Sequence, residues 1–125
     1  MPSVYVGTSL LNISLAKEII NKFRSHGVDI SYDWTTHGQV FNSDDLYKYG
    51  TKEFDGVKSA DLFFMICPAR TGTHVELGIA LAYNKPIILV LDKDTELKTF
   101  YFLQNVSRFL SLETAFSFAL EKLKS

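Results

Sequence analysis

The stretch GTHVELGIALAYNKP, residues 72–86, decides the fold, and Glu76 is a lone carboxylate within its otherwise apolar helical pattern. The run at residues 62–66 before it is continuously apolar, which is typical of a buried parallel strand. A strand, a short loop and an apolar helix in this order indicate one unit of an α/β protein. Two interpretations of Glu76 are open. Thr73-x-x-Glu76 fits a capping box at a helix start. A carboxylate kept ionised by the helix N-terminus, in a semi-apolar cleft, also suits the nucleophile of a glycosyl-transferring enzyme.

The same alternation of strand and helix patterns runs through the whole chain. Strand patterns occupy residues 4–7, 28–32, 62–67, 87–91 and 106–110, and helical patterns occupy residues 13–26, 43–59, 72–84, 95–104 and 111–123. Such alternation implies right-handed crossovers and a parallel sheet covered on both faces. We therefore expect a doubly wound α/β fold with a sheet of about five parallel strands, a flavodoxin/Rossmann-like three-layer sandwich. Residues 1–125 are expected to form a single domain.

Composition limits the functional classes. The 125 residues carry a formal net charge of −1, which gives no general attraction to nucleic acid or to an anionic membrane. Cys67 is the only cysteine in the sequence, so an internal disulfide is impossible and a reducing cytoplasm is expected. The first residues lack a signal-peptide pattern, and no apolar stretch reaches the length of a membrane span. The sequence predicts a cytoplasmic protein with neither a nucleic-acid polymer nor a membrane as partner.

In doubly wound folds, ligands bind beyond the carboxyl ends of the strands. The turn Gly7-Thr8-Ser9 lies there, and it either offers N–H groups and hydroxyls to an anion or is an ordinary turn. Trp34, in a polar loop at residues 33–42, either stacks on a base or folds back over the core. Tyr5 fits the core, but a buried hydroxyl needs a partner, and a catalytic carboxylate would serve. Glu53, taken alone, fits a solvated helix surface.

Several common chemistries are absent from the sequence. It contains neither a dinucleotide-binding G-x-G-x-x-G nor a phosphate-binding G-x-x-x-x-G-K-[ST] pattern, and it has no G-x-S-x-G elbow. The histidines His26, His37 and His74 are far apart and lack metal-ligand spacing. We expect no metal and no cofactor, and Cys67 fits an apolar strand end better than a nucleophile.

Four segments, in order along nearly the whole chain, carry a resemblance to a known family. They are residues 72–86 with Glu76-Leu-Gly78-Ile-Ala80, residues 4–9 with Tyr5, residues 53–61 with Glu53, and residues 105–110 with Asn105. In these segments the chain resembles the nucleoside 2-deoxyribosyltransferase-like proteins, including the deoxynucleoside 5′-monophosphate N-glycosidases.

The resemblance implies cleavage of the N-glycosidic bond of 2′-deoxynucleosides or their 5′-monophosphates. Glu76 would attack C1′ to give a deoxyribosyl-enzyme, Tyr5 would orient it, and a second base or water would take the sugar. Glu53 stands where the family has a substrate-binding aspartate. Asn105 would complete the site of a neighbouring subunit, which implies a homo-oligomer. The substrate-binding residues expected on this basis are Gly7, Ser9, Asp33, Trp34, Arg70, Gly72, His74 and Asn105.

Two departures bear on the substrate. Arg70 stands where transferases often have an aspartate, and an arginine at a pocket rim favours a phosphate or carboxylate. Leu11 stands where the monophosphate enzymes carry a basic residue. The choice between nucleoside and monophosphate, and between transferase and hydrolase, stays open. Two other interpretations remain: a non-catalytic nucleotide-binding sensor of the same fold, and a TIR-like NAD glycohydrolase.

Overall fold

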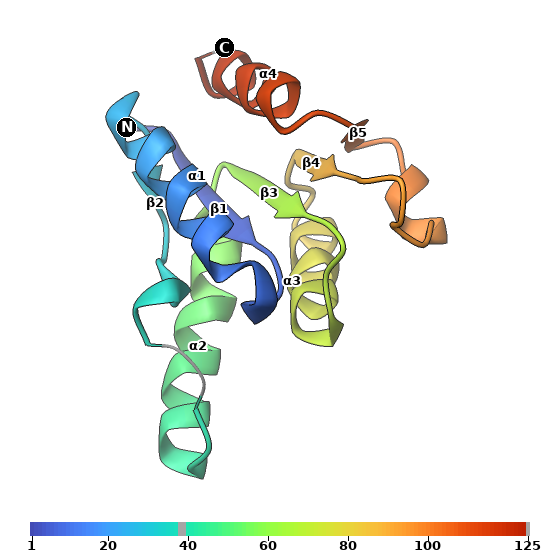
Figure 1. Cartoon of the computed structure of the whole chain (residues 1–125). Coiled ribbons are helices and arrows are strands. Elements are labelled where there is room, and N and C mark those ends of the chain that lie inside the picture. Colours follow the sequence, from blue (N-terminus) through green and yellow to red (C-terminus); the bar gives the residue numbers. More distant parts are fainter. Residues whose placement is uncertain (38–39, 125) are drawn as a thin grey trace.

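A five-stranded parallel sheet forms the centre of the molecule, in the strand order β2-β1-β3-β4-β5 (Figure 1). The computed structural model describes residues 1–37 and 40–124. The strands are β1 (Ser3–Gly7), β2 (Asp29–Ile30), β3 (Leu62–Ile66), β4 (Ile87–Val90) and β5 (Val106–Phe109). Positions 38–39 of the expected loop, and residue 125, lie outside the described residues.

Helices cover both faces of the sheet, which confirms the predicted doubly wound α/β architecture (Figure 1). The helices are α1 (Ile13–Ser25), α2 (Ser43–Ser59), α3 (Thr71–Ala82) and α4 (Leu112–Lys124), with short 3-10 turns η1 (Leu10–Asn12), η2 (Trp34–Thr36) and η3 (Thr99–Phe102). Helices α1 and α4 pack on the face that carries Val4, Val6 and Phe64. Helices α2 and α3 pack on the face that carries Tyr5 and Phe63. The alternation follows the two-residue period of a strand.

The first strand marks the point where the chain reverses direction across the sheet. Strand β1 pairs with β2 on one side and with β3 on the other, and both neighbours are parallel to it. The crossovers from β1 to β2 and from β2 to β3 therefore run in opposite directions. Ligands of doubly wound sheets bind in the crevice beyond the carboxyl ends of strands at such a switch point. In this chain that crevice lies beyond Gly7 and Ile66.

Several predicted element boundaries differ from the structure, and the helix expected at residues 95–104 is reduced to the 3-10 turn η3. The strand expected at residues 28–32 is limited to Asp29–Ile30, since it lies at the edge of the sheet. The start of α2 is capped by Asn42, because its Oδ1 accepts a hydrogen bond of 2.8 Å from the Asp45 amide. At the start of α4, the Ser111 hydroxyl accepts a 3.2 Å hydrogen bond from the Thr114 amide.

Part of the apolar face of α2 is exposed and lies outside the core. Leu46 and Phe54 are 52% and 41% exposed, and within this helix Gly56 and Val57 are the buried residues. The amino-terminal half of α2 extends past the end of the sheet (Figure 1), so its inward side chains face the crevice and not the core.

The capping-box interpretation of Thr73 and Glu76 is wrong. Helix α3 begins at Thr71, with Arg70 as the N-cap residue and no side-chain capping bond. Glu76 therefore lies in the second helical turn, and Thr73 is buried. Glu76 is free of a capping role. In the part of the chain that the structure describes, no helix is both long enough and apolar enough to cross a bilayer.

Candidate active site

A cavity of about 540 Å³ occupies the crevice beyond β1 and β3, between α2 and the start of α3. It is lined by Thr8, Ser9, Leu10, Leu11, Trp34, His37, Val40, Leu46, Tyr49, Gly50, Glu53, Arg70, Gly72, Thr73 and Glu76. The two acidic side chains in this set, Glu53 and Glu76, come from the two helices that flank the crevice.

Tyr5 holds the carboxyl group of Glu76. The Tyr5 hydroxyl donates a hydrogen bond of 2.6 Å to Glu76 Oε2, and the Tyr5 ring is fully buried against Phe63. Burial and the neighbouring Glu76 raise the pKa of Tyr5 far above its ordinary value, so the phenol remains a donor. The predicted pairing of the buried hydroxyl with this carboxylate is confirmed.

Gly7 leaves the room that the carboxyl group needs. A Cβ atom at this position would lie 3.2 Å from Glu76 Oε1 and 3.2 Å from Thr73 Cγ2. Such contacts are tighter than ordinary van der Waals packing. A glycine at position 7 therefore lets the backbone of β1 approach the Glu76 carboxyl group closely. The presence of glycine here is explained without a contact to substrate.

The carboxyl groups of Glu76 and Glu53 influence each other's ionisation. Burial raises the pKa of Glu76 to about 8, against the opposing effect of the Tyr5 hydrogen bond, and the charge of Glu53 and a hydrogen bond to it raise it further. The expectation that the helix N-terminus keeps Glu76 ionised is therefore wrong, because loss of hydration outweighs it. Two carboxyl groups that interact in this way titrate as a pair. At neutral pH the site therefore favours the protonated form of Glu76.

His37 is the site residue that sequence reasoning missed. Its Nε2 lies 3.3 Å from Glu53 Oε2, and its ring stacks on Tyr49 with centroids 4.1 Å apart. Burial raises the pKa of Glu53, and His37 opposes that shift. The sequence raises His37 only as a possible metal ligand. Its position in the rim loop after β2 was the available signal, but nothing in the sequence shows that this loop faces α2.

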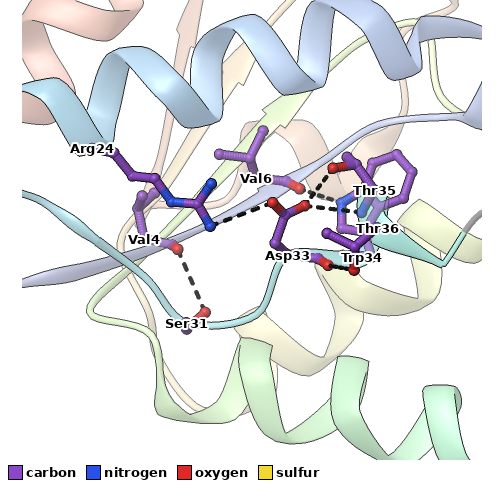
Figure 2. Close-up of polar contacts among 8 residues, drawn as sticks. All are labelled: Val4, Val6, Arg24, Ser31, Asp33, Trp34, Thr35 and Thr36. Carbon is purple, nitrogen blue, oxygen red and sulfur yellow. Dashed lines mark hydrogen bonds and ion pairs between the residues drawn. The ribbon is translucent and has the colours of Figure 1, made fainter.

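Trp34 folds back over the sheet. Its Nε1 donates a 2.6 Å hydrogen bond to the Val6 carbonyl, and the residue is 6% exposed (Figure 2). This confirms the interpretation in which the indole folds back over the core. Trp34 also lines the cavity, and its stacking on a base stays a prediction.

Asp33 has local partners. Figure 2 shows its carboxylate between Arg24 and Thr35. It accepts a hydrogen bond of 3.0 Å from the Thr35 amide and another from the Thr35 hydroxyl, and it lies 3.4 Å from Arg24 Nη2. Asp33 is absent from the cavity lining. Its carboxylate is engaged in capping η2, which explains the residue without a base contact.

The mouth of the cavity carries one fixed cation and two hydroxyl residues. Arg70 is exposed, lines the cavity, and forms no ion pair with a carboxylate among the described residues. Ser9 and Thr8 line the same cavity from the loop after β1, and Gly72 lines it from the first turn of α3. Leu10 and Leu11 complete this wall. The predicted residues Ser9, Arg70 and Gly72 are therefore brought together.

His74 and Asn105 lie away from the cavity of their own chain. His74 turns toward η3, where its Nε2 is 2.7 Å from the Tyr101 hydroxyl. Asn105 directly precedes β5, at the amino ends of the strands, whereas Glu76 lies beyond their carboxyl ends. The Asn105 Nδ2 donates a 2.8 Å hydrogen bond to the Lys85 carbonyl. A role of Asn105 in a neighbouring subunit stays a prediction. Within the described residues, no group of three or more His, Cys, Asp and Glu side chains is placed to hold a metal ion.

Comparison with solved structures identifies proteins that share this fold. Neither a protein-family model nor a curated protein matches the chain by sequence. The CMP N-glycosidase BcmB of Clostridium botulinum superposes with a TM-score of 0.66 at 21% identity, over 95% of this chain and 98% of that one. This chain has the fold of the nucleoside 2-deoxyribosyltransferase-like proteins. BlsM superposes with a TM-score of 0.70 at 21% identity, over 98% of this chain and 89% of that one. A 2-deoxyribosyltransferase from Leishmania mexicana gives 0.65 at 14% identity, over 97% and 98%. At these identities the likeness establishes the fold.

Proposed function

We propose that the protein cleaves the N-glycosidic bond of 2′-deoxynucleoside 5′-monophosphates or the corresponding nucleosides, with Glu76 as the nucleophile. The observation that carries this proposal is the hydrogen-bonded set Tyr5–Glu76–Glu53 in the crevice at the switch point. Paired carboxyl groups with one proton between them are what glycosidic cleavage requires, since one group attacks carbon while the other handles the proton. The names of the solved structures with this fold agree with glycosyl transfer or cleavage.

The first step uses the stored proton. Glu76 passes its proton to Glu53 and becomes a carboxylate, with the Tyr5 hydroxyl holding Oε2. The other carboxylate oxygen attacks C1′, so that a C1′–O bond forms as the C1′–N bond breaks. The electron pair of the broken bond goes to the base nitrogen, and Glu53 delivers the proton to the departing base. The negative carboxylate stabilises the positive charge that develops on the sugar.

The second step returns the site to its starting state. Water, or the nitrogen of a second base, attacks C1′ of the deoxyribosyl-enzyme, and the C1′–O bond to Glu76 breaks. Glu53, now ionised, removes the proton of the attacking group. His37 holds the Glu53 carboxyl toward the reacting atoms, at 3.3 Å between Nε2 and Oε2. One residue thus serves as acid and then as base.

Arg70 makes the monophosphate the better substrate. Its guanidinium is an exposed cation at the cavity mouth without a described carboxylate partner. Guanidinium pairs with phosphate in a bidentate manner. The Ser9 hydroxyl and the free amides at the start of α3 add donors on the same side. The leucines at positions 10 and 11 contribute no charge, so the phosphate contact depends on Arg70.

The test is direct detection of free base. The protein is incubated separately with each deoxynucleoside, each deoxynucleoside 5′-monophosphate and NAD, with and without free adenine. The proposal predicts base release from deoxynucleotides, abolished in Glu76→Ala. Exchange of the base would define a transferase, and release without exchange a hydrolase. Thermal stabilisation by a nucleotide without turnover would contradict the proposal and support a sensor. Cleavage of NAD alone would contradict the substrate class.

A further inference from the structure

We infer that Tyr101 and His74 are positioning residues that hold Arg70 toward the cavity from the far side of α3. This inference rests on the proposed function, because it assigns to Arg70 the binding of the substrate's phosphate. Tyr101 lies in η3, in the connection between β4 and β5, and neither it nor His74 lines the cavity. The pair would therefore act on the substrate only through Arg70.

The contacts form a continuous chain to the backbone of Arg70. The Tyr101 hydroxyl lies 2.7 Å from His74 Nε2, and His74 Nδ1 lies 2.8 Å from the Arg70 carbonyl oxygen. That carbonyl also accepts the His74 amide at 3.2 Å. A carbonyl oxygen only accepts, so Nδ1 carries the imidazole proton. In the neutral imidazole with its proton on Nδ1, Nε2 is the acceptor of the hydrogen bond that the Tyr101 hydroxyl donates. This chain of bonds fixes one tautomer and the plane of the Arg70–Thr71 peptide.

Tyr101 is itself rigidly held. The residue is 1% exposed, and its ring is stacked near that of His74 with an interplanar angle of 15°. Its carbonyl accepts a 2.9 Å hydrogen bond from Arg108 Nη1, and its hydroxyl lies 4.0 Å from the sulfur of Cys67. Burial raises the pKa of Cys67 to about 11, so the thiol stays neutral beside it. Tyr101 is therefore held at both its backbone and its hydroxyl. Through His74 it can restrain the loop between β3 and α3, which ends at the exposed Arg70.

The loop needs such an anchor because α3 lacks a side-chain cap. Arg70 is the N-cap residue in extended conformation, and its own side chain makes no capping bond. The His74 imidazole, one turn later, instead binds the Arg70 carbonyl and so holds the backbone of the N-cap residue. Removal of the Tyr101 hydroxyl leaves Nε2 of His74 without its donor and frees the imidazole to rotate. The orientation of the Arg70 peptide is then no longer fixed.

The experiment is a double-mutant cycle with Tyr101→Phe and Arg70→Ala. Tyr101→Phe is expected to raise KM for the monophosphate about 3- to 10-fold, the cost of one ordinary hydrogen bond, while kcat and the kinetics with the unphosphorylated nucleoside stay unchanged. In the Arg70→Ala background the same substitution is expected to have no further effect, because the two act in series. Tyr83→Phe, at the other end of α3 where the hydroxyl has no described hydrogen bond, is the matched control. Equal losses with nucleoside and monophosphate, or additive effects in the cycle, would overturn the inference.

A second readout is independent of turnover. Nitrogen-15 NMR of the His74 ring should show a protonated Nδ1 and a hydrogen-bonded, unprotonated Nε2, and Tyr101→Phe should shift the Nε2 resonance. Hydrogen exchange of the amides at residues 71–74 should become faster in that variant and stay unchanged in Tyr83→Phe. If the wild type cleaves no nucleotide but the NMR results hold, the proposed function fails and the positioning pair stands. A protonated Nε2 in the wild type would overturn the pair whatever the activity.

Discussion

At the scale of single residues, the central feature is a carboxyl group that the fold keeps from ionising. Glu76 is enclosed beside Tyr5 and Glu53, and burial raises its pKa to about 8. A surface glutamate would have lost its proton near its ordinary value of about 4.3. The folded state therefore holds a proton that the unfolded chain releases at neutral pH. This arrangement costs stability and supplies an acid at the place where a leaving base needs one.

Substitution of Glu76 should reveal that cost. Between the unfolded pKa and about 8, the unfolded chain is ionised while the folded protein keeps the proton, so stability of the wild type falls as pH rises through this range. Glu76→Gln keeps the acceptor for Tyr5 and removes the titration. We expect it to be equal to the wild type near pH 4 and more stable near pH 8 by roughly a few kcal/mol. Urea unfolding at both pH values measures this, and an equal difference at both would contradict the buried proton.

The pH dependence of cleavage follows from the same proton. The proposed mechanism needs one proton in the Glu53–Glu76 pair, and Glu76 loses its proton above about pH 8. We therefore expect kcat/KM to fall above that pH, because no acid remains for the leaving base. Glu53→Gln should lose about 10²- to 10⁴-fold in kcat, the usual range for a general acid–base, and should lose this alkaline limb. A wild-type profile that keeps rising through pH 9 would contradict the shared proton.

At the scale of elements, the site depends on how closely α2 approaches the sheet. A Cβ atom on Gly56 would lie 2.7 Å from Tyr32 Cβ and 3.2 Å from the Tyr5 ring, so this glycine sets the distance between the helix and β1. Glu53 lies one turn earlier on the same helix. Its carboxyl group reaches Glu76 only because the helix lies that close.

Gly56→Ala should therefore shift α2 outward. We expect a loss of about 1–3 kcal/mol in the free energy of unfolding, as for overpacked cores, together with a weaker Glu53–Glu76 contact and reduced activity. Gly78→Ala is the control, because a Cβ there meets nothing within 4 Å, and it should gain up to about 1 kcal/mol from helix propensity. Thermal or urea unfolding distinguishes the two. Equal stability of both variants would show that α2 is not set by this contact.

The element scale also shows where sequence reasoning succeeds. The continuous apolar runs at β3 and β4, and the caps and glycines between them, were sufficient to predict the order of strands and helices. The start of α3 was not predictable, because both Arg70 and Thr73 are plausible N-cap positions, and the difference moves Glu76 from the first helical turn to the second. Likewise Leu46 has the spacing of a core residue, but α2 extends past the sheet and leaves that residue at the cavity.

At the scale of the whole molecule, the predicted site residues lie at two different edges of the sheet. The carboxyl-end edge carries Tyr5, Glu53 and Glu76, whereas Asn105 lies before β5 at the amino-end edge. Sequence order could pair Tyr5 with Glu76, because both adjoin the carboxyl ends of central strands. It could not place His37, His74 or Asp33, whose partners come from other loops.

A role for Asn105 in a neighbouring subunit has a clear test. If the protein forms a homo-oligomer in which Asn105 completes another chain's site, then Glu76→Gln and Asn105→Ala should each be inactive alone. Mixed and reassembled, they should regain part of the activity, because a mixed pair contains one site with both native residues. Sedimentation velocity should show a species larger than the 14.2 kDa chain. Full activity of Asn105→Ala, or a monomer at working concentrations, would limit Asn105 to its bond with Lys85.

The measurement that tests the central claim most directly is the identification of the covalent intermediate. The protein is mixed with its best deoxynucleotide substrate, quenched in acid during turnover, digested and analysed by mass spectrometry. The account predicts a sugar-phosphate adduct on the peptide that contains Glu76, attached to that side chain, and no adduct in Glu76→Gln. An adduct on another residue, or base release by Glu76→Gln at the wild-type rate, would contradict it.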